Sequence, residues 1–511
     1  MIVRVCKAVA RSLPQPTVQR AFDFLNRLAA FQRRLLHGFA VSRLLRRWPD
    51  PGPGLVPLRR HGRFILANAA SRFSAVEAAE SNLRLVTAAA HAADIDFRLG
   101  EPGPDGTRTV SVDAADIPPM LEALARTAAA RPVYVRFGAA HPPVLACDAP
   151  SLTGGESLTV FEYAAAGDLL LADERLGCTV VQRPAKARPA PVTVLNEPVD
   201  VVYTWVDGSD PEWARAKSEA WDRTHPGELH KFAANDERYR SHDELRYSLR
   251  SIDYFAPWVN RIFLVTAGQV PAWLNHEDPR IVMVDHRQIF ADPSALPTFN
   301  SHAIEAQLHR IPGLSEHFLY LNDDVFLGRP VRPELFFHGN GVTKFFFSDQ
   351  RIVPGAPDAG DLPVDSAAKR NRALMEERFG RTVEFKFKHA PHAQRVSTLT
   401  KLAEDFAVDH AATTAARFRS PGDISIPSSL AHHYGYAIGA AVPADIAYRY
   451  CDIGAPLAHL KLLRLLHQRD ADVFCLNEVG GTGVDPQKQD VMVQRFLQSY
   501  YPVPSSFERD S

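Results

Sequence analysis

Apolar and polar residues alternate along the second half of the chain with two different periods. From about residue 192 onward, short apolar runs of the length of a buried strand are separated by segments with helical periodicity. The runs predicted to be strands are 201–206, 261–266, 280–285, 317–321 and 473–476. Strands that alternate with helices are typical of a parallel sheet. We therefore predict an α/β fold with a Rossmann-like, mainly parallel sheet in residues 192–511.

Two helices of this segment have recognisable limits. Ser241 and Glu244 have the spacing of a capping box, which predicts a helix start. An apolar face then repeats at helical spacing and stops before Pro257, as expected because proline disfavours a helical residue before it. A further helix is expected over 301–310.

The first part of the chain has a different pattern. Between about 60 and 182, strand-like runs alternate with helices, the first of them opened by a second capping-box pattern, Ser74 and Glu77. Proline-rich stretches precede and follow this part. We therefore divide the chain into a helical arm (1–50), a smaller α/β module with its linker (51–191) and the larger α/β segment (192–511).

The arm is basic and amphipathic. Residues 1–48 contain ten lysines or arginines and one acid, Asp23, and apolar residues recur at helical spacing among the arginines. Such a helix is suited to an anionic membrane surface, to docking on the rest of the chain, or to a partner subunit, including a second copy. The sequence leaves these three options open.

Composition limits the class of protein. A formal net charge of -1 argues against a nucleic-acid partner. The five cysteines are scattered and form no CxxC pair, which argues against a disulfide framework or a zinc site and favours a reducing compartment. No run approaches the roughly 20 apolar residues of a membrane span. We expect a cytoplasmic protein, with any peripheral contact at the inner face of the plasma membrane through residues 1–48.

Polar residues follow two of the predicted strands. Asp207, Gly208 and Asp210 come after the first strand, and Asn322, Asp323 and Asp324 come directly after the fourth. The carboxyl ends of parallel strands form the ligand-binding edge of an open α/β sheet. Adjacent carboxylates are costly unless they are solvated, hydrogen-bonded or bound to a cation such as Mg²⁺ or Mn²⁺. Ordinary solvated turns are the other interpretation of both motifs.

Cations and imidazoles follow later in the chain. His389 and His392 lie in a stretch that also contains two lysines, Arg417 and Arg419 follow, and Asn477 ends the last predicted strand. Histidine transfers protons near neutral pH, and arginine binds phosphate oxygens. These are the ingredients of phosphoryl transfer, although the pattern does not establish that they converge.

At this point the chain resembles the Stealth family, which includes bacterial capsule and exopolysaccharide sugar-1-phosphate transferases. The similar stretches cover roughly 198–508 in order, namely 200–211, 243–325, 389–417 and 476–508. The resemblance implies transfer of a hexose 1-phosphate from a nucleotide sugar, typically a UDP-sugar, to a hydroxyl of a glycan acceptor, with release of UMP. It also implies a divalent metal ion, Mg²⁺ or Mn²⁺.

The resemblance also implies roles for individual residues. Asp323 or Asp324 would be the base or a metal ligand, and His389 or His392 would assist proton transfer or hold the phosphate. Arg417 or Arg419 would stabilise developing charge, and Asn477 would lie with Asp324 at the metal. The residues expected to bind the substrate are Asp207, Gly208, Asp210, Arg246, Arg250 and Asn322.

One departure from the family pattern concerns the fourth stretch. After Asn477, some relatives are richer in Asn and Asp, whereas Glu478 here leads into a glycine-rich run. This leaves open which further residues of the stretch bind metal.

Two other functions fit the same residues. A metal-dependent glycosyltransferase would use the same sheet and donor but release UDP. A non-catalytic protein that binds a glycan or a membrane surface would use the acidic residues only as solvated turns. The spacing of residues alone does not separate these functions.

Overall fold

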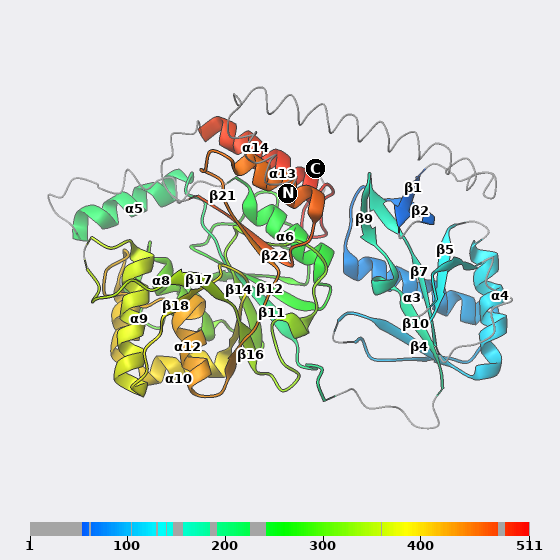
Figure 1. Cartoon of the computed structure of the whole chain (residues 1–511), viewed down its shortest axis with the longest axis horizontal. Helices are drawn as coiled ribbons and strands as arrows, with labels where there is room; N and C mark the ends of the chain where they lie inside the picture. Colours follow the sequence, from blue (N-terminus) through cyan, green and yellow to red (C-terminus); the bar gives the residue numbers. More distant parts are fainter. Residues whose placement is uncertain are drawn as a thin grey trace, which may run out of the picture.

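A five-stranded sheet organises the second half of the chain in the computed structural model (Figure 1). Its strands are β11 (Val199–Thr204), β12 (Val259–Thr266), β13 (Ile281–Asp285), β14 (His317–Leu321) and β19 (His392–Arg395). They lie in the order β13-β12-β11-β14-β19, and the first four are parallel while β19 is antiparallel to β14. The predicted mainly parallel sheet is therefore confirmed.

The structure describes residues 54–60, 63–103, 105–128, 131–138, 141–146, 157–183, 192–224, 242–358, 360–478 and 486–509. The predicted arm, most of both linkers and the glycine-rich run after Glu478 lie outside these residues. No helix among the described residues has the length and apolar character needed to cross a bilayer.

Both faces of the central sheet are buried, which explains why its strands are continuous apolar runs. Val201 and Tyr203 of β11 point into one hydrophobic core, shared with helix α6 (Glu244–Phe255). Val202, between them, points into a second core on the opposite face, shared with α10 (Val396–Asp405) and α12 (Ala431–Ala437). The alternation follows from the two-residue repeat of a strand.

A buried carboxylate aligns the amino ends of the central strands. Asp200 of β11 is fully buried, and its two oxygens accept hydrogen bonds from the backbone nitrogens of Arg261 (3.1 Å) and Ser315 (2.8 Å) and from Asn260 Nδ2 (2.8 Å). Asp200 is therefore a structural residue of the first motif. It lies at the amino end of β11, whereas Asp207 follows the carboxyl end.

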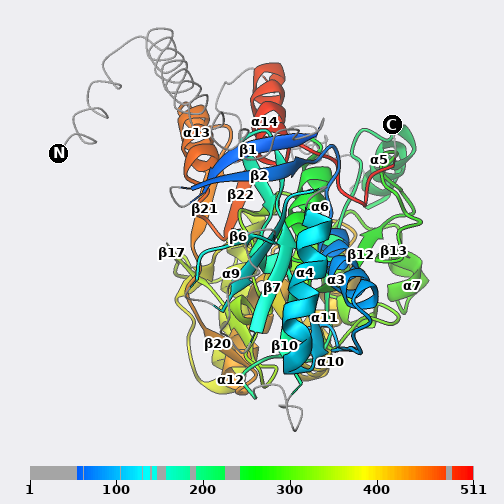
Figure 2. The same ribbon diagram turned by 90° about the vertical axis from the view of Figure 1, so that its right-hand side faces the viewer.

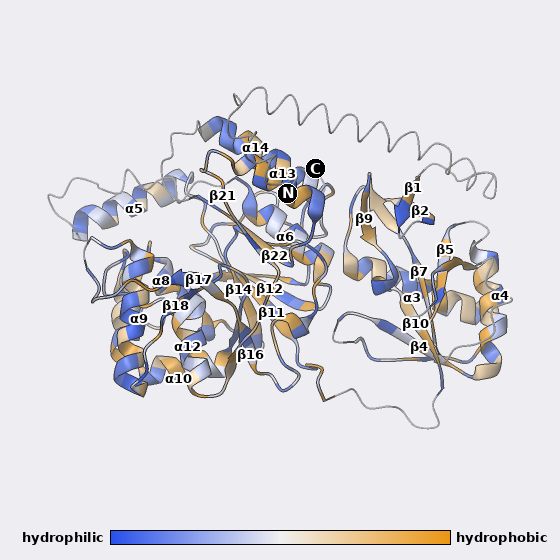
Figure 3. Ribbon diagram, in the orientation of Figure 1, coloured by the Kyte–Doolittle hydropathy of each residue, from blue (hydrophilic) through white to orange (hydrophobic). Residues whose placement is uncertain are grey.

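The other described elements surround this sheet. The helices are α5 (Pro211–Thr224), α7 (His286–Ile289), α8 (Ser301–Glu305), α9 (Pro363–Phe379), α11 (Ala407–Ala415), α13 (Ala458–Gln468) and α14 (Pro486–Tyr500). The strands are β15 (Val325–Leu327), β16 (Thr343–Phe345), β17 (Phe347–Arg351), β18 (Phe385–Phe387), β20 (Ala441–Pro443), β21 (Tyr448–Asp452) and β22 (Val473–Asn477). Figure 3 shows that α5 is largely hydrophilic, in contrast to the apolar strands.

The predicted helix limits need correction. Helix α6 starts at Glu244 with Asp243 as the preceding, left-handed residue, so Glu244 is the first helical residue and not the third after a cap. The expected helix over 301–310 is shorter, because a 3₁₀ turn (Leu308–Arg310) replaces its second half. Ser74 does precede α3 (Ala75–Ala92), but its hydroxyl does not cap the helix.

Residues 54–183 form the predicted smaller α/β module (Figure 2). Its helices are α3 and α4 (Ile117–Ala128), and its strands are β1 (Leu55–Arg60), β2 (Arg63–Ala69), β3 (Arg98–Leu99), β4 (Arg108–Val112), β5 (Val133–Phe137), β6 (Val144–Leu145), β7 (Ser157–Glu162), β8 (Ala164–Ala166), β9 (Leu169–Ala172) and β10 (Cys178–Gln182). The strands form a four-stranded and a six-stranded sheet. The module also has two hydrophobic cores of its own.

The module contacts the larger segment through α6 and the C-terminal residues. Ser74 Oγ donates to Asp253 Oδ1 at 2.9 Å, and the Phe73 nitrogen donates to the Pro504 carbonyl at 3.0 Å. Ser506 also donates to Asp253, from its backbone nitrogen and its hydroxyl. Asp253 thus joins the module, helix α6 and the C-terminal residues.

An ion pair between α6 and the C-terminus is almost fully buried. Arg250 Nε and Nη2 each donate at 2.7 Å to Glu508, and Arg250 Nη1 donates to the Tyr501 carbonyl. Glu508 and Arg250 are 6% and 7% exposed, so solvent cannot replace either partner.

We predict that Glu508→Ala lowers the free energy of unfolding by about 3–5 kcal/mol, because it leaves the Arg250 charge buried without a partner. Urea denaturation of the purified chain measures this loss. The matched control is Glu277→Ala, an exposed glutamate, which we expect to change stability by less than about 0.5 kcal/mol. Equal stability of the two variants would contradict a structural role for the pair.

Candidate active site

The carboxyl ends of β11 and β14 lie side by side, since Tyr203 pairs with Leu321 in the parallel register. The chain runs from β11 to β12 and β13 on one side, then returns to β14 on the other, so strand order reverses between β11 and β14. In open α/β sheets the ligand-binding crevice lies at this reversal. Asp207 and Asp324 follow these two strands, so the structure brings the two acidic motifs to one edge, as predicted.

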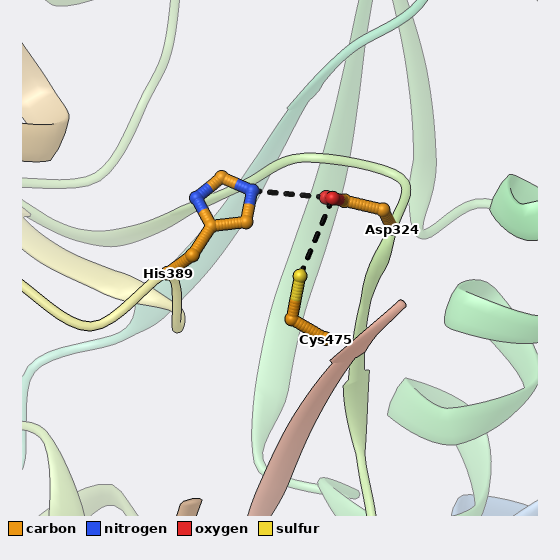
Figure 4. A group of neighbouring side chains, drawn as sticks. All are labelled: Asp324, His389 and Cys475. Carbon is orange, nitrogen blue, oxygen red and sulfur yellow. Dashed lines mark hydrogen bonds and ion pairs between the residues drawn. The ribbon is translucent and has the colours of Figure 1, made fainter. Parts of the chain in front are cut away.

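Asp324 is the centre of a compact group of side chains (Figure 4). Its Oδ1 lies 3.0 Å from His389 Nε2, and its Oδ2 accepts weaker hydrogen bonds from Cys475 Sγ and Asn477 Nδ2, both at 3.4 Å. The side chains of Asp324 and His389 are 19% and 32% exposed, so the pair is accessible to a ligand. Residues from three distant stretches of sequence therefore converge here.

A small second sheet brings the fourth stretch to Asp324. Strand β15 begins at Val325, directly after Asp324, and pairs antiparallel with β22 so that Val325 lies opposite Cys475. The Leu476 nitrogen also donates to the Asp324 carbonyl at 3.0 Å. The predicted strand at 473–476 is confirmed, and its pairing with β15 places Asn477 beside the acidic pair.

The acidic residues at this edge oppose one another's ionisation. Burial and the neighbouring charge of Asp324 raise the pKa of Asp323 to about 7. Burial and the charge of Asp323 raise the pKa of Glu244 to about 8. The sequence pattern marks Glu244 only as a capping residue, and its membership of the acidic group depends on how α6 packs against the strand ends.

His389 and His392 have opposite electrostatics although they are only three residues apart. Burial lowers the pKa of His389, but the Asp324 carboxylate outweighs this effect, so the pKa is raised overall and the protonated form is favoured. Burial and the neighbouring His432 instead hold the pKa of His392 well below its usual range. The expected proton-transfer or phosphate role therefore suits His389 and not His392, which is 5% exposed and hydrogen-bonded to His432 at 3.0 Å.

A second buried acid, Glu305, lies near the site without any signal in the sequence. Glu305 is the last residue of α8, and its Oε1 accepts a hydrogen bond from Tyr320 at 3.1 Å. Its Oε2 is buried and has no hydrogen-bond partner among the described residues. Asn322 approaches the same tyrosine hydroxyl at 3.4 Å, and the charge of Glu305 contributes to the raised pKa of His389. No sequence pattern marks Glu305, because it lies in an ordinary helical segment.

Gln269 at the end of β12 orders the first acidic motif. Its side chain accepts from the Asp207 nitrogen (3.0 Å) and donates to Asp210 Oδ2 (2.8 Å). This second bond and backbone donors from α5 lower the pKa of Asp210. Gln269 also lines a cavity of about 370 Å³ at the carboxyl ends of β12 and β13, together with Thr266, Gly268, Asp285 and Arg287. Asp207, Gly208 and Asp210 therefore lie next to a cavity of ligand size.

The two arginines of α6 differ in their surroundings. Arg250 is buried against Glu508 and Tyr501, so the structure gives it a structural contact in place of the expected contact with substrate. Arg246 is partly exposed, pairs with Asp243 at 2.9 Å and lies over the Trp273 ring.

The two later arginines hold a loop of the second family stretch. Arg417 donates to the Ser294 and Pro297 carbonyls, and Arg419 donates to Ser301 Oγ at 2.7 Å. Both arginines thus join the segment after α11 to the residues at the start of α8, the helix that ends with Glu305.

The donor atoms around Asp324 fit a metal ion. One ligand atom each from Asp324, His389 and Cys475 lie within 4.8 Å of one another. A carboxylate, an imidazole and a thiol form a mixed set that suits a borderline ion, whereas Asn477 adds an amide oxygen of the kind that Mg²⁺ and Mn²⁺ prefer. Asn477 was predicted at the metal, and Cys475 was not, because a single cysteine within an apolar run gave no signal.

Comparisons with known proteins agree with the order of these stretches. The conserved regions 1 to 4 of Stealth proteins match residues 197–221, 238–345, 388–436 and 464–511. The chain is 40% identical to the exopolysaccharide phosphotransferase SCO6023 of Streptomyces coelicolor, over 98% of the chain and 95% of the relative. It is 37% identical to an exopolysaccharide phosphotransferase of Nocardia farcinica, over 89% of the chain and 84% of the relative.

Other matches are partial or weak. The exopolysaccharide phosphotransferase SCO2594 of Streptomyces coelicolor is 52% identical over 61% of the chain, which spans about half (52%) of that relative. Among solved structures, the galactosyltransferase LgtC matches 60% of the chain and 96% of its own chain at 12% identity, with a TM-score of 0.28. The four matched regions and the near full-length relative show that this chain belongs to the family of Stealth proteins.

Proposed function

We propose that the chain is a phosphotransferase that moves a hexose 1-phosphate from a nucleotide sugar, a UDP-sugar, to a hydroxyl of a glycan acceptor in exopolysaccharide synthesis, with release of UMP. The observation that carries this proposal is the Asp324–His389 pair beside Asp323, at the reversal point of a sheet in a Stealth protein. The near full-length relatives named exopolysaccharide phosphotransferase support the reaction class.

The donor nucleotide is assigned to the cavity at the ends of β12 and β13. The volume of about 370 Å³ is within the range of small-molecule sites, and Gln269 connects its wall to Asp207 and Asp210. Arg287 on the same wall, which pairs with Asp285 at 2.7 Å, is the cation that we propose for contact with the donor phosphates. The reactive phosphate would then extend from this cavity toward Asp324.

Asp323 is the proposed general base. A carboxyl whose pKa is about 7 is ionised in part at neutral pH and still basic enough to accept a proton. It takes the proton of the acceptor hydroxyl while the new oxygen–phosphorus bond forms, and the phosphoanhydride bond to the nucleotide breaks so that UMP leaves. Protonated His389 neutralises charge on the phosphate oxygens, and Arg419 supplies further positive charge from the α8 entrance.

Asp324 Oδ2, Asn477 and Cys475 would hold a divalent cation, and protonated His389 would orient the Asp324 carboxylate through Oδ1. Such an ion would neutralise negative charge on the donor phosphates. The backbone pairing of β15 with β22 keeps these ligand side chains close to one another.

The reaction is tested by the identity of the released nucleotide. We expect the purified chain, incubated with UDP-sugars, Mg²⁺ or Mn²⁺ and a polysaccharide acceptor, to release UMP and to attach hexose 1-phosphate to the acceptor. Chromatography separates UMP from UDP. Release of UDP with an unphosphorylated product would establish the glycosyltransferase, and glycan binding without any nucleotide product would establish the non-catalytic protein.

We predict that Asp323→Asn lowers kcat by roughly 10²–10⁴-fold, because it removes the base. In the parent enzyme kcat/KM should rise with pH through about 7 as Asp323 loses its proton. It should fall again above the raised pKa of His389, where the imidazole loses its charge. A pH profile from 5 to 10 checks this, and an acid limb that persists unchanged in Asp323→Asn would assign the base elsewhere.

We predict that Asp324→Asn weakens Mn²⁺ binding by at least about tenfold, because it removes the carboxylate ligand at the centre of the group. Electron paramagnetic resonance of free Mn²⁺ measures the affinity without turnover. The matched control is Asp168→Asn, an exposed aspartate between β8 and β9, which should bind Mn²⁺ as the parent does. Unchanged Mn²⁺ affinity in Asp324→Asn would remove the metal from this position.

A further inference from the structure

Beside the candidate active site, a two-stranded sheet exposes aromatic side chains that the proposed reaction does not use. Strands β17 and β18 pair so that Phe347 lies opposite Phe387, and their rings stack with centroids 5.3 Å apart at 14°. Phe347 is 39% exposed, and Tyr436, at the end of α12, is 57% exposed. We call the surface formed by Phe347, Phe385, Phe387 and Tyr436 the aromatic face.

The aromatic face lies close to the reactive residues because Phe387 and His389 are near neighbours in the chain. Phe387 precedes His389 by two residues, so their Cα atoms are at most about 7 Å apart. His389 in turn contacts Asp324 at 3.0 Å. A molecule that rests on Phe387 is therefore within one or two sugar units of the proposed base.

A continuous series of rings supports the aromatic face from below. Phe387 lies 4.9 Å from His432, His432 lies 5.2 Å from His392, and His392 lies 6.4 Å from His389. Phe345, which is buried, packs edge-on against both Phe347 and Tyr436. Burial keeps His432 and His392 uncharged by lowering their pKa, so the support is a rigid and neutral layer.

The exposed area indicates the size of the ligand. An aromatic side chain offers about 150–250 Å², so the exposed parts of Phe347 and Tyr436 amount to roughly 200 Å². This is far below the roughly 800 Å² per partner of a stable protein interface, and it matches one or two sugar rings. Strand β17 also exposes Asp349, Gln350 and Arg351, which can bind hydroxyl groups around such a ring.

We propose that the aromatic face is the docking surface for the saccharide acceptor, an inference that rests on the proposed function. One face of a pyranose ring carries C–H groups, and these are attracted to the electron-rich face of an aromatic ring. Stacking on Phe347 and Tyr436 would hold the acceptor chain, and the hydroxyl that attacks the donor phosphate would reach Asp323 past His389.

Kinetics of the full chain test the proposal where phosphotransfer is detected. We expect Phe347→Ala and Tyr436→Ala each to raise the acceptor KM by about tenfold, with the donor KM changed by less than about twofold. Phe347→Trp should restore the acceptor KM, because it replaces one stacking ring with another. The matched control is Val408→Ala, an exposed apolar residue on α11 that is 82% exposed, which should leave both KM values unchanged.

A binding measurement tests the same surface without turnover. We expect saturation-transfer NMR with methyl glycosides of glucose, galactose, mannose and N-acetylglucosamine to show contact with the sugar C–H groups, reduced at least about fivefold in Phe347→Ala. This result can be obtained even if the released nucleotide contradicts phosphotransfer, so the two failures are distinguishable.

Three results would overturn the proposal. The first is an acceptor KM or a saturation signal that is the same in Phe347→Ala, Tyr436→Ala and the parent. The second is an equal rise of donor and acceptor KM. The third is a change of oligomeric state in the alanine variants by light scattering, which would assign the aromatic face to a second copy of the chain.

Discussion

The crowding of carboxylates at one edge of the sheet is the constraint on which the site depends. Asp323, Asp324 and Glu244 come together at this partly buried edge, and burial together with their mutual repulsion raises the pKa of Asp323 and Glu244. His389 relieves part of this charge and becomes more basic as a result. A site with this balance favours ligands that bring positive charge, and a divalent cation bound with donor phosphates meets the requirement.

The surrounding fold maintains this arrangement by pairing distant parts of the chain. The β15–β22 pair brings Cys475 and Asn477 to Asp324, and the Arg250–Glu508 pair holds the C-terminal residues against α6, the helix that begins with Glu244. Asp253 of the same helix also binds the module formed by residues 54–183. Helix α6 therefore carries both an acidic residue of the site and the contacts that keep the rest of the chain in place.

The acidic edge lies between two surfaces of different character. On one side, the cavity at the ends of β12 and β13 is lined by Gln269, Asp285 and Arg287, which suits a charged nucleotide. On the other side, the aromatic face is uncharged at its centre and rests on buried, neutral histidines. Donor and acceptor would approach the same Asp323 from these two sides, each recognised by a different physical interaction.

The sequence by itself determined the strands and the chemistry of the motifs, but not the helix limits. Continuous apolar runs predicted the parallel strands because both faces of the sheet are buried, and polar residues after the strands marked the edge that carries Asp207 and Asp324. Tertiary structure alone decided which of the chemically similar residues meet there. His389 contacts Asp324, whereas His392 is buried against His432. Arg250 is paired with Glu508 and does not reach the site. No sequence pattern predicted that Glu244, Glu305 and Cys475 would lie at the site. The physical reason is that burial and charge depend on through-space neighbours. These neighbours are distant in sequence: His392 and His432 are 40 positions apart, and Asp324 and Asn477 are 153 positions apart.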